Sequence, residues 1–140
     1  MIIIQGEMGS GKSRLALDLL KHKEKGLYLL LDKDHSVLQR LKKQKMDYTF
    51  MTNCYLMDIK YRILERGGLL NNDLEYVVVD SLNRIKDSKS YLEKIKYLQE
   101  VEKDFGVKII ATHNILRMLD KIPKKIKDID GVKIIEVRRP

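Results

Sequence analysis

The sequence predicts an α/β fold, a three-layer sandwich in which helices flank a mainly parallel β-sheet. Short apolar segments alternate with amphipathic segments along the whole chain. Several of the short segments are apolar throughout, as strands covered on both faces are, and strand–helix alternation with such strands is typical of parallel sheets. A length of 140 residues fits a single domain over residues 1–140.

The first part of the chain predicts two strand–helix pairs. Residues 2–5 form an apolar strand, and a glycine-rich turn joins this strand to a helix over residues 12–25, which Gly26 ends. Residues 27–32 are a second, mostly apolar strand. A short basic helix follows over residues 35–45, because its apolar side chains recur on one side.

The middle of the chain continues the alternation. Residues 48–51 predict a short third strand, and residues 54–66 carry apolar side chains at helical spacing before a pair of glycines. Residues 75–80 form another buried strand. Apolar residues between positions 92 and 101 mark a further helix, which Gly106 ends.

The C-terminal part predicts a change in strand direction. Residues 107–112 form a strand like the earlier ones. Two apolar segments, 126–129 and 132–137, then flank Asp130-Gly131, a dipeptide suited to a tight hairpin turn. We therefore expect a C-terminal antiparallel hairpin at one edge of the sheet.

Composition excludes several classes of protein. The chain is 44% hydrophobic and 34% charged, which excludes a disordered chain and a collagen-like repeat. Its longest apolar run, residues 27–31, is far shorter than the roughly 20 residues of a membrane span. No signal-peptide pattern precedes the first strand, and the single cysteine, Cys54, cannot form an internal disulfide. We expect a cytoplasmic protein without membrane contact.

The charge balance favours anionic partners. The chain has 28 Lys and Arg against 20 Asp and Glu, a net charge of +8. Such a surface suits DNA or RNA, although ordinary solvated lysines give the same balance. Two basic groups are candidates for DNA contact: Arg40, Lys42, Lys43 and Lys45 in the first, and Lys121, Lys124, Lys125 and Lys127 in the second.

The turn after the first strand has a complete phosphate-loop pattern, G-x-x-x-x-G-K-[ST]. Glycines let successive backbone N–H groups point inward around a polyphosphate, and the following helix adds its unpaired N–H groups. Lys12 is placed to reach the β- and γ-phosphates, and the Ser13 hydroxyl to ligate Mg²⁺. A glycine-rich turn that only joins strand and helix is the alternative. The loop consists of Gly6, Glu7, Met8, Gly9, Ser10, Gly11, Lys12 and Ser13.

The strand over residues 76–80 has the form of a Walker B strand, with four mostly apolar residues before Asp80. A carboxylate at the carboxyl end of a parallel strand lies on the ligand side of the sheet, where it can hold the water shell of Mg²⁺. Aspartate is also a common turn residue. No Asn-Lys-x-Asp segment of the kind that recognises guanine is present, which favours ATP over GTP.

These motifs in this order resemble the RecA-like division of P-loop NTPases, which includes recombinases, KaiC and replicative helicases. The segment Leu31-Asp32-Lys33-Asp34-His35 is similar to the end of that family's second strand. There an acidic residue, usually glutamate, orients the attacking water, and the resemblance gives Asp34 this catalytic role. Asp34 also suits the N-cap of the helix that follows it.

Two further segments carry the resemblance. Residues 109–114 are similar to the family's strand that ends in a Thr-Asn-Gln type sequence, so the resemblance implies that Asn114 senses the γ-phosphate. His113 beside it could share that task or be structural. The terminal residues look like the closing strand of KaiC relatives, which implies that Arg138 or Arg139 reaches a neighbouring subunit's nucleotide. A frayed basic terminus is the alternative.

We therefore expect an ATP-binding and ATP-hydrolysing enzyme, with ATP and Mg²⁺ in its site. The resemblance implies a role with DNA in recombination, repair or replication, and a homo-oligomer with nucleotide at the subunit interface. Two alternatives remain open. One is a regulatory ATPase of KaiC type, in which ATP switches assembly, and the other is a small P-loop kinase.

Overall fold

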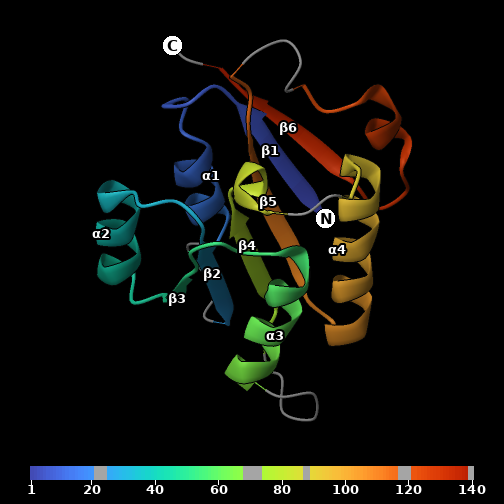
Figure 1. The fold of residues 1–140 in the computed structure, drawn as a ribbon. Coiled ribbons are helices and arrows are strands. Elements are labelled where there is room, and N and C mark those ends of the chain that lie inside the picture. The colour runs from blue at the N-terminus through green and yellow to red at the C-terminus, as the bar shows by residue number, and fades with distance from the viewer. Residues whose placement is uncertain (21–24, 68–73, 87–88, 117–120, 139–140) are drawn as a thin grey trace.

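The structure is a computed structural model that describes residues 1–20, 25–67, 74–86, 89–116 and 121–138. It contains a six-stranded sheet with the order β3-β2-β4-β5-β1-β6 (Figure 1). All neighbouring strands run parallel. The strands are β1 (Ile2–Gly6), β2 (Gly26–Leu30), β3 (Asp47–Phe50), β4 (Tyr76–Asp80), β5 (Lys108–Asn114) and β6 (Lys133–Val137).

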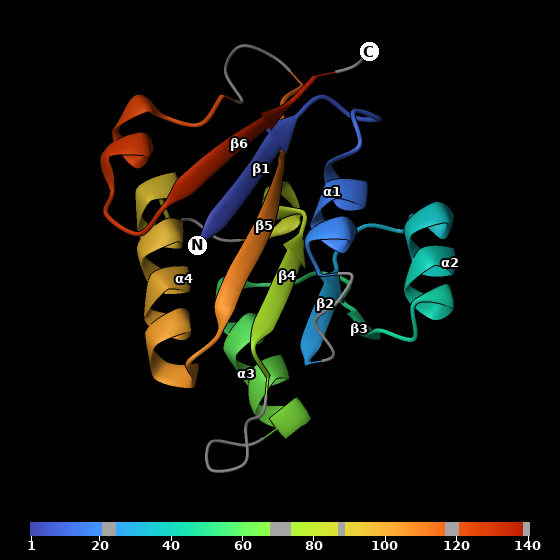
Figure 2. The same cartoon turned by 180° about the vertical axis from the view of Figure 1, so that it is seen from behind.

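Helices cover both faces of this sheet, as Figures 1 and 2 show from opposite sides. One face carries α1 (Lys12–Leu19) and α2 (His35–Lys43). The other carries α3 (Leu56–Gly67) and α4 (Tyr91–Phe105). Two short 3-10 helices, η1 (Leu82–Arg84) and η3 (Lys124–Asp128), complete the described elements. The predicted α/β class and its layers are thus confirmed.

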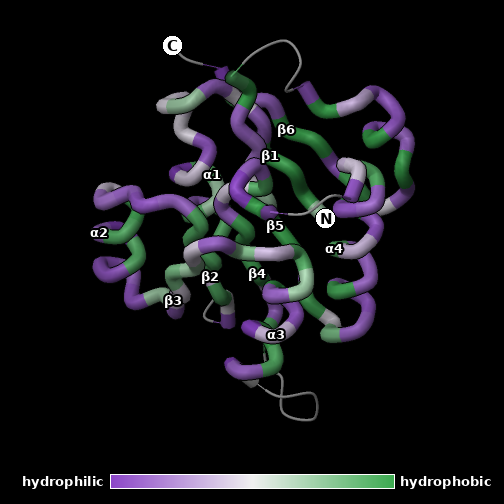
Figure 3. Tube along the Cα trace, in the orientation of Figure 1, coloured by the Kyte–Doolittle hydropathy of each residue, from purple (hydrophilic) through white to green (hydrophobic). Residues whose placement is uncertain are grey.

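The strands separate two hydrophobic cores because successive side chains point to opposite faces of the sheet. On β4, Val77 and Val79 belong to the core under α3 and α4, whereas Val78 belongs to the core under α1 and α2. Figure 3 shows the hydrophobic stretches along the central strands. By the same alternation Asp80 faces α1, which places its carboxylate beside the loop after β1.

The predicted antiparallel hairpin is wrong. Of its two arms only β6 is a strand, and β6 pairs with β1 in parallel register, Gly6 opposite Val137. The segment that was expected to pair with it contains η3, which buries Ile126 completely in the core under α4. The Asp130-Gly131 turn does form, with Gly131 at φ 82°. The open edge of β1 offers β6 a longer row of backbone partners than a hairpin arm would.

Other boundaries differ by a few residues. Helix α1 ends at Leu19 with Leu20 as its C-cap, and Gly26 begins β2 instead of ending a helix. The predicted continuation over residues 21–24 lies outside the described residues. Gly106 ends α4 in the left-handed conformation, as predicted. None of the helices in the described ranges has the length and apolar composition needed to cross a membrane.

Candidate functional site

The loop between β1 and α1 needs its glycines. A Cβ on Gly6 would lie 2.5 Å from the carbonyl oxygen of Val137 and 2.6 Å from Ser10 Oγ. Gly9 and Gly11 have φ angles of 76° and 95°, values that residues with a Cβ rarely adopt. The glycine spacing that the sequence shows is therefore required by the backbone path of this loop.

Lys12 closes the loop from inside. Its side chain is buried, and its ammonium donates to the Glu7 carbonyl oxygen at 2.7 Å and to Ser10 Oγ at 3.5 Å. Helix α1 begins at Lys12 with Gly11 as its N-cap, and no side chain in the described residues caps this N-terminus. Helical N–H groups and an ammonium group thus face the same small space, an arrangement that binds anions.

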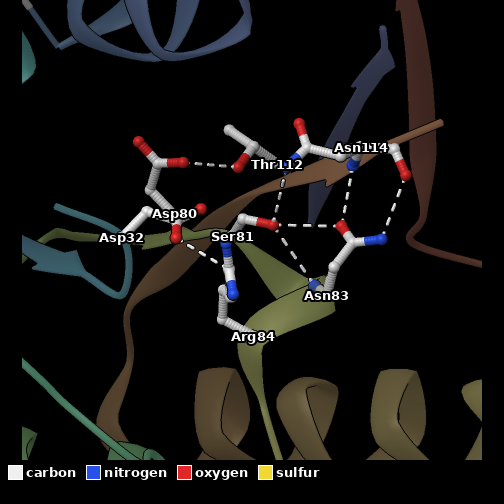
Figure 4. Close-up of polar contacts among 7 residues, drawn as sticks. All are labelled: Asp32, Asp80, Ser81, Asn83, Arg84, Thr112 and Asn114. Carbon is white, nitrogen blue, oxygen red and sulfur yellow. Dashed lines mark hydrogen bonds and ion pairs between the residues drawn. The ribbon is translucent and has the colours of Figure 1, made fainter. Parts of the chain in front are cut away.

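Asp80 receives three hydroxyl donors from three different elements. Ser13 of α1 donates to Oδ2 at 2.7 Å, and Tyr28 of β2 donates to the same oxygen. Thr112 of β5 donates to Oδ1 at 2.7 Å (Figure 4). The Ser13–Asp80 bond joins the two halves of the predicted magnesium site, which lie 67 positions apart in sequence. Because Ser13 donates its hydroxyl proton in this hydrogen bond, the lone pairs of its oxygen remain available for a cation.

Asn114 belongs to a polar network at the ends of β4 and β5 (Figure 4). Its backbone N–H donates to Asn83 Oδ1 at 2.7 Å, and Asn83 Nδ2 donates back to the Asn114 carbonyl oxygen at 3.0 Å. The Asn114 side-chain amide reaches Ser81 Oγ at 3.5 Å. This network fixes the end of β5, where Asn114 also lines the cavity described below.

Asp34 is the N-cap of α2. Its Oδ1 accepts from the backbone N–H groups of Ser36 and Val37 at 3.0 and 3.4 Å, and from Ser36 Oγ at 2.7 Å. The hydrogen bond from the Ser36 hydroxyl is the main cause that lowers the pKa of Asp34. The capping interpretation is therefore confirmed. Asp34 also lines the cavity, so the structure leaves the catalytic role of its carboxylate as a prediction.

These groups line one cavity of about 390 Å³ at the carboxyl edge of the sheet. Gly9, Gly11, Lys12 and Ser13 line it with Met8, and Asp80 and Asn114 line it as well. The sequence prediction missed the wall between α1 and α2. That wall contains Arg14, Leu17, Asp32, Val37 and Arg40.

The sequence carried two signals for this wall. Arg14 directly follows Ser13, and Arg40 lies three and four positions after Val37 and Ser36, hence on the same face of α2. The sequence groups Arg40 with Lys42, Lys43 and Lys45 as a candidate DNA-contacting surface. The structure instead separates it from Lys42, Lys43 and Lys45, which are exposed, and puts it on the cavity wall.

Two predicted residues lie away from the cavity. The Arg138 side chain is 84% exposed and lies 3.8 Å from Glu136, and it is not among the residues lining the cavity. Arg139 lies outside the described residues. His113 is buried on the opposite face of the sheet, where its ring meets Tyr91 edge-on at 5.2 Å.

The site fits a divalent cation held with a polyphosphate. Among the described residues no group of three or more His, Cys, Asp and Glu side chains could hold a metal by itself. Ser13 and Asp80 supply one hydroxyl and one carboxylate, and Mg²⁺ is commonly bound by such a small protein set together with water and phosphates. No protein-family model matches the chain, and no curated protein matches it significantly. Function has to be inferred from this geometry.

Proposed function

We propose that the protein binds ATP with Mg²⁺ and hydrolyses it, as a RecA-like P-loop NTPase acting with nucleic acid. The observation that carries the proposal is the hydrogen bond between Ser13 and Asp80 at the mouth of a glycine loop closed by Lys12. A glycine turn that only joins strand and helix needs neither a buried lysine nor a distant carboxylate. A polyphosphate site needs both.

Binding starts from the loop. Lys12 exchanges its bond to the Glu7 carbonyl for the β- and γ-phosphates, and the N–H groups of the loop and of α1 donate to the same phosphate oxygens. Bound Mg²⁺ would supply positive charge that offsets the charge of the phosphates. Ser13 would hold it directly and Asp80 through water.

Hydrolysis uses Asp34 and Asn114, which also line the cavity. All the hydrogen bonds that Asp34 makes within the described residues use Oδ1, and Asp34 lines the cavity, so Oδ2 is the proposed acceptor for a water proton. Asn114 donates from its side-chain amide to a γ-phosphate oxygen. The hydrogen bonds that join Asn114 to the loop after β4 couple that loop to the presence of the γ-phosphate.

The nucleoside fits the wall between α1 and α2. The planar guanidinium groups of Arg14 and Arg40 can stack on a base, beside the buried side chains of Leu17 and Val37. Neither arginine has an ion pair in the described part of the chain. The cavity volume of about 390 Å³ lies within the range of small-molecule sites, roughly 300–1,000 Å³.

A second candidate is a nucleotide-switched regulatory protein with little hydrolysis. The observation that favours it is the capping of α2 by Asp34, which holds this short carboxylate against the helix. Two results together would decide for this function. The protein would assemble when nucleotide is bound, and added nucleic acid would leave its low rate of phosphate release unchanged.

Nucleic acid is the proposed partner because of two exposed basic surfaces. Lys42, Lys43 and Lys45 follow one another at the end of α2. On the other face of the sheet, Lys121 precedes η3, and Lys124, Lys125 and Lys127 are part of it. Neither surface has interleaved aromatic side chains, so we expect contact with phosphates instead of base stacking.

The test is equilibrium binding of a nonhydrolysable ATP analogue with Mg²⁺, by calorimetry, to the wild type, Lys12→Ala and Lys43→Ala. Lys12→Ala should weaken binding by about 100-fold, because charge-assisted hydrogen bonds to the phosphates are lost. Lys43→Ala removes an exposed lysine outside the cavity and should bind normally. Normal affinity in Lys12→Ala would refute the site.

A further inference from the structure

Tyr28 lies at the centre of β2 between leucines, in the core under α1 and α2. Its side chain is completely buried. Phenylalanine or leucine would fill the same apolar space, so the hydroxyl group needs a separate explanation. Its hydrogen bond goes to Asp80 Oδ2 on the neighbouring strand β4.

The hydroxyl acts as a permanent donor. A tyrosine phenol is protonated at neutral pH, so its proton is available to the carboxylate.

The three donors to Asp80 differ in what else they can do. Ser13 is the first-turn residue of α1 and lines the cavity, so its oxygen can meet a cation. Tyr28 and Thr112 are absent from the cavity lining and contact Asp80 from within the sheet. One holds Oδ2 and the other holds Oδ1, so together they fix the plane of the carboxylate.

We propose that Tyr28 is a positioning residue that orients Asp80 for the divalent cation of the nucleotide complex. The inference rests on the proposed function, because it concerns the same site. Groups that orient metal-binding side chains typically change metal affinity or activity by about 10- to 100-fold when they are removed. Tyr28 never touches nucleotide or cation, so it acts only through Asp80.

The chain offers a matched control in Tyr91. This second tyrosine has a buried hydroxyl, but that hydroxyl has no hydrogen-bond partner within the described residues. It lies beside His113 on the opposite face of the sheet. Burial alone raises the pKa of Tyr91. Tyr28→Phe and Tyr91→Phe therefore each remove one buried phenol oxygen, and only the first of these touches Asp80.

The experiment measures the affinity of the wild type, Tyr28→Phe and Tyr91→Phe for a nonhydrolysable ATP analogue across a Mg²⁺ titration and in EDTA. Tyr28→Phe should raise the Mg²⁺ concentration needed for half-maximal binding by about tenfold or more, with unchanged affinity in EDTA. Tyr91→Phe should match the wild type. Thr112→Val removes the donor to Asp80 Oδ1 and should raise the required Mg²⁺ concentration in the same way.

Wild-type Mg²⁺ dependence in Tyr28→Phe overturns the inference, as does an equal change in Tyr91→Phe, which would indicate a merely structural effect. If Tyr28→Phe does not fold, the wild type labelled with fluorotyrosine replaces it. The ¹⁹F resonance of Tyr28 should then shift during the Mg²⁺ titration while that of Tyr91 stays constant, and a static Tyr28 resonance refutes the role. A wild type that binds no nucleotide refutes the proposed function itself.

Discussion

Gly6 shows how one residue connects the fold to the site. It is the last residue of β1, it pairs with Val137 of β6, and it opens the loop that Lys12 closes. The missing side chain lets the backbone of β6 and the hydroxyl of Ser10 approach from two directions. The absence of a side chain at Gly6 is therefore needed both for the pairing of β1 with β6 and for the closed loop.

We expect Gly6→Ala to destabilise the protein by about 1–3 kcal/mol, as overpacking of a close contact does. It should also weaken nucleotide binding, because the loop must open to admit the Cβ. Urea denaturation and analogue binding measure the two effects. Gly26→Ala is the control, since the one tight contact of its Cβ would be with the flexible end of Met46, at 2.8 Å. Equal stability of the two variants would contradict this account.

At helix α2, one carboxylate, that of Asp34, has both a structural role and a proposed catalytic role. Asp34 caps the helix, and the helix carries Ser36, Val37 and Arg40 into the cavity. Asparagine caps helices about as well as aspartate, whereas alanine does not. Two substitutions can therefore separate the structural role of Asp34 from the catalytic one.

Asp34→Asn should keep both the stability of the protein and its nucleotide affinity but stop phosphate release, because an amide cannot accept the proton of water. Asp34→Ala should stop release and also lower the free energy of unfolding by about 0.5–2 kcal/mol. Chemical denaturation and a phosphate-release assay measure these quantities. Normal turnover in Asp34→Asn would remove Asp34 from the mechanism.

The pH dependence of stability provides a check on the cap itself. Hydrogen bonds, chiefly from the Ser36 hydroxyl, lower the folded-state pKa of Asp34 below its ordinary 3.8. The resulting stabilisation is present above that ordinary value and is lost as the pH falls through the lowered one. The stability advantage of the wild type over Asp34→Ala should therefore shrink in acid, and an advantage that grew instead would argue against the cap.

The elements that the sequence predicted well are those with local causes. Strands β1, β2, β4 and β5 are recognisable because they are apolar, and Gly106 ends α4 by its own backbone conformation. The direction of β6 was mispredicted because Asp130-Gly131 specifies only that the chain turns there. The free edge of β1, distant in sequence, determines which strand β6 joins.

The site divides in the same way. The phosphate loop is contiguous, so its pattern could be read directly from residues 6–13. Tyr28 and Thr112 could not be found, because a tyrosine and a threonine within apolar strands look like core residues until the strand order brings them to Asp80. Arg40 likewise reads as part of a basic helix until the packing of α2 against α1 turns it to the cavity.

At the scale of the whole molecule, strand order assembles the site. Strand β5 lies between β4 and β1, so the carboxyl ends of three neighbouring parallel strands present Asp80, Asn114 and the phosphate loop side by side. Loops at this edge are where open α/β sheets bind ligands. Strand β6 extends the same edge and ends with Val137 beside Gly6, so Arg138 follows close to the loop but does not line the cavity.

Arg138 should therefore act on a neighbouring copy of the chain. Its exposed contact with Glu136, at 3.8 Å, holds it only weakly, and its position after β6 lets it project from the rim. We expect phosphate release per molecule to rise with protein concentration, and Arg138→Ala to abolish the rise without changing analogue affinity. An arginine that reaches across an interface stabilises the charge on the transferring phosphoryl group.

Mixing two variants distinguishes an active site that two copies of the chain share from an active site within one copy that assembly only stimulates. Lys12→Ala keeps Arg138 but loses its own site, and Arg138→Ala keeps its site but loses the arginine. Equimolar mixtures of these two variants should recover part of the rise of phosphate release with protein concentration, since mixed assemblies contain complete sites. Arg62→Ala, which removes an exposed arginine paired with Glu65 on α3, should behave as the wild type throughout. Release that is independent of concentration, or a mixture that shows no such rise, would show that each chain works alone and that Arg138 belongs to a terminus without a catalytic part.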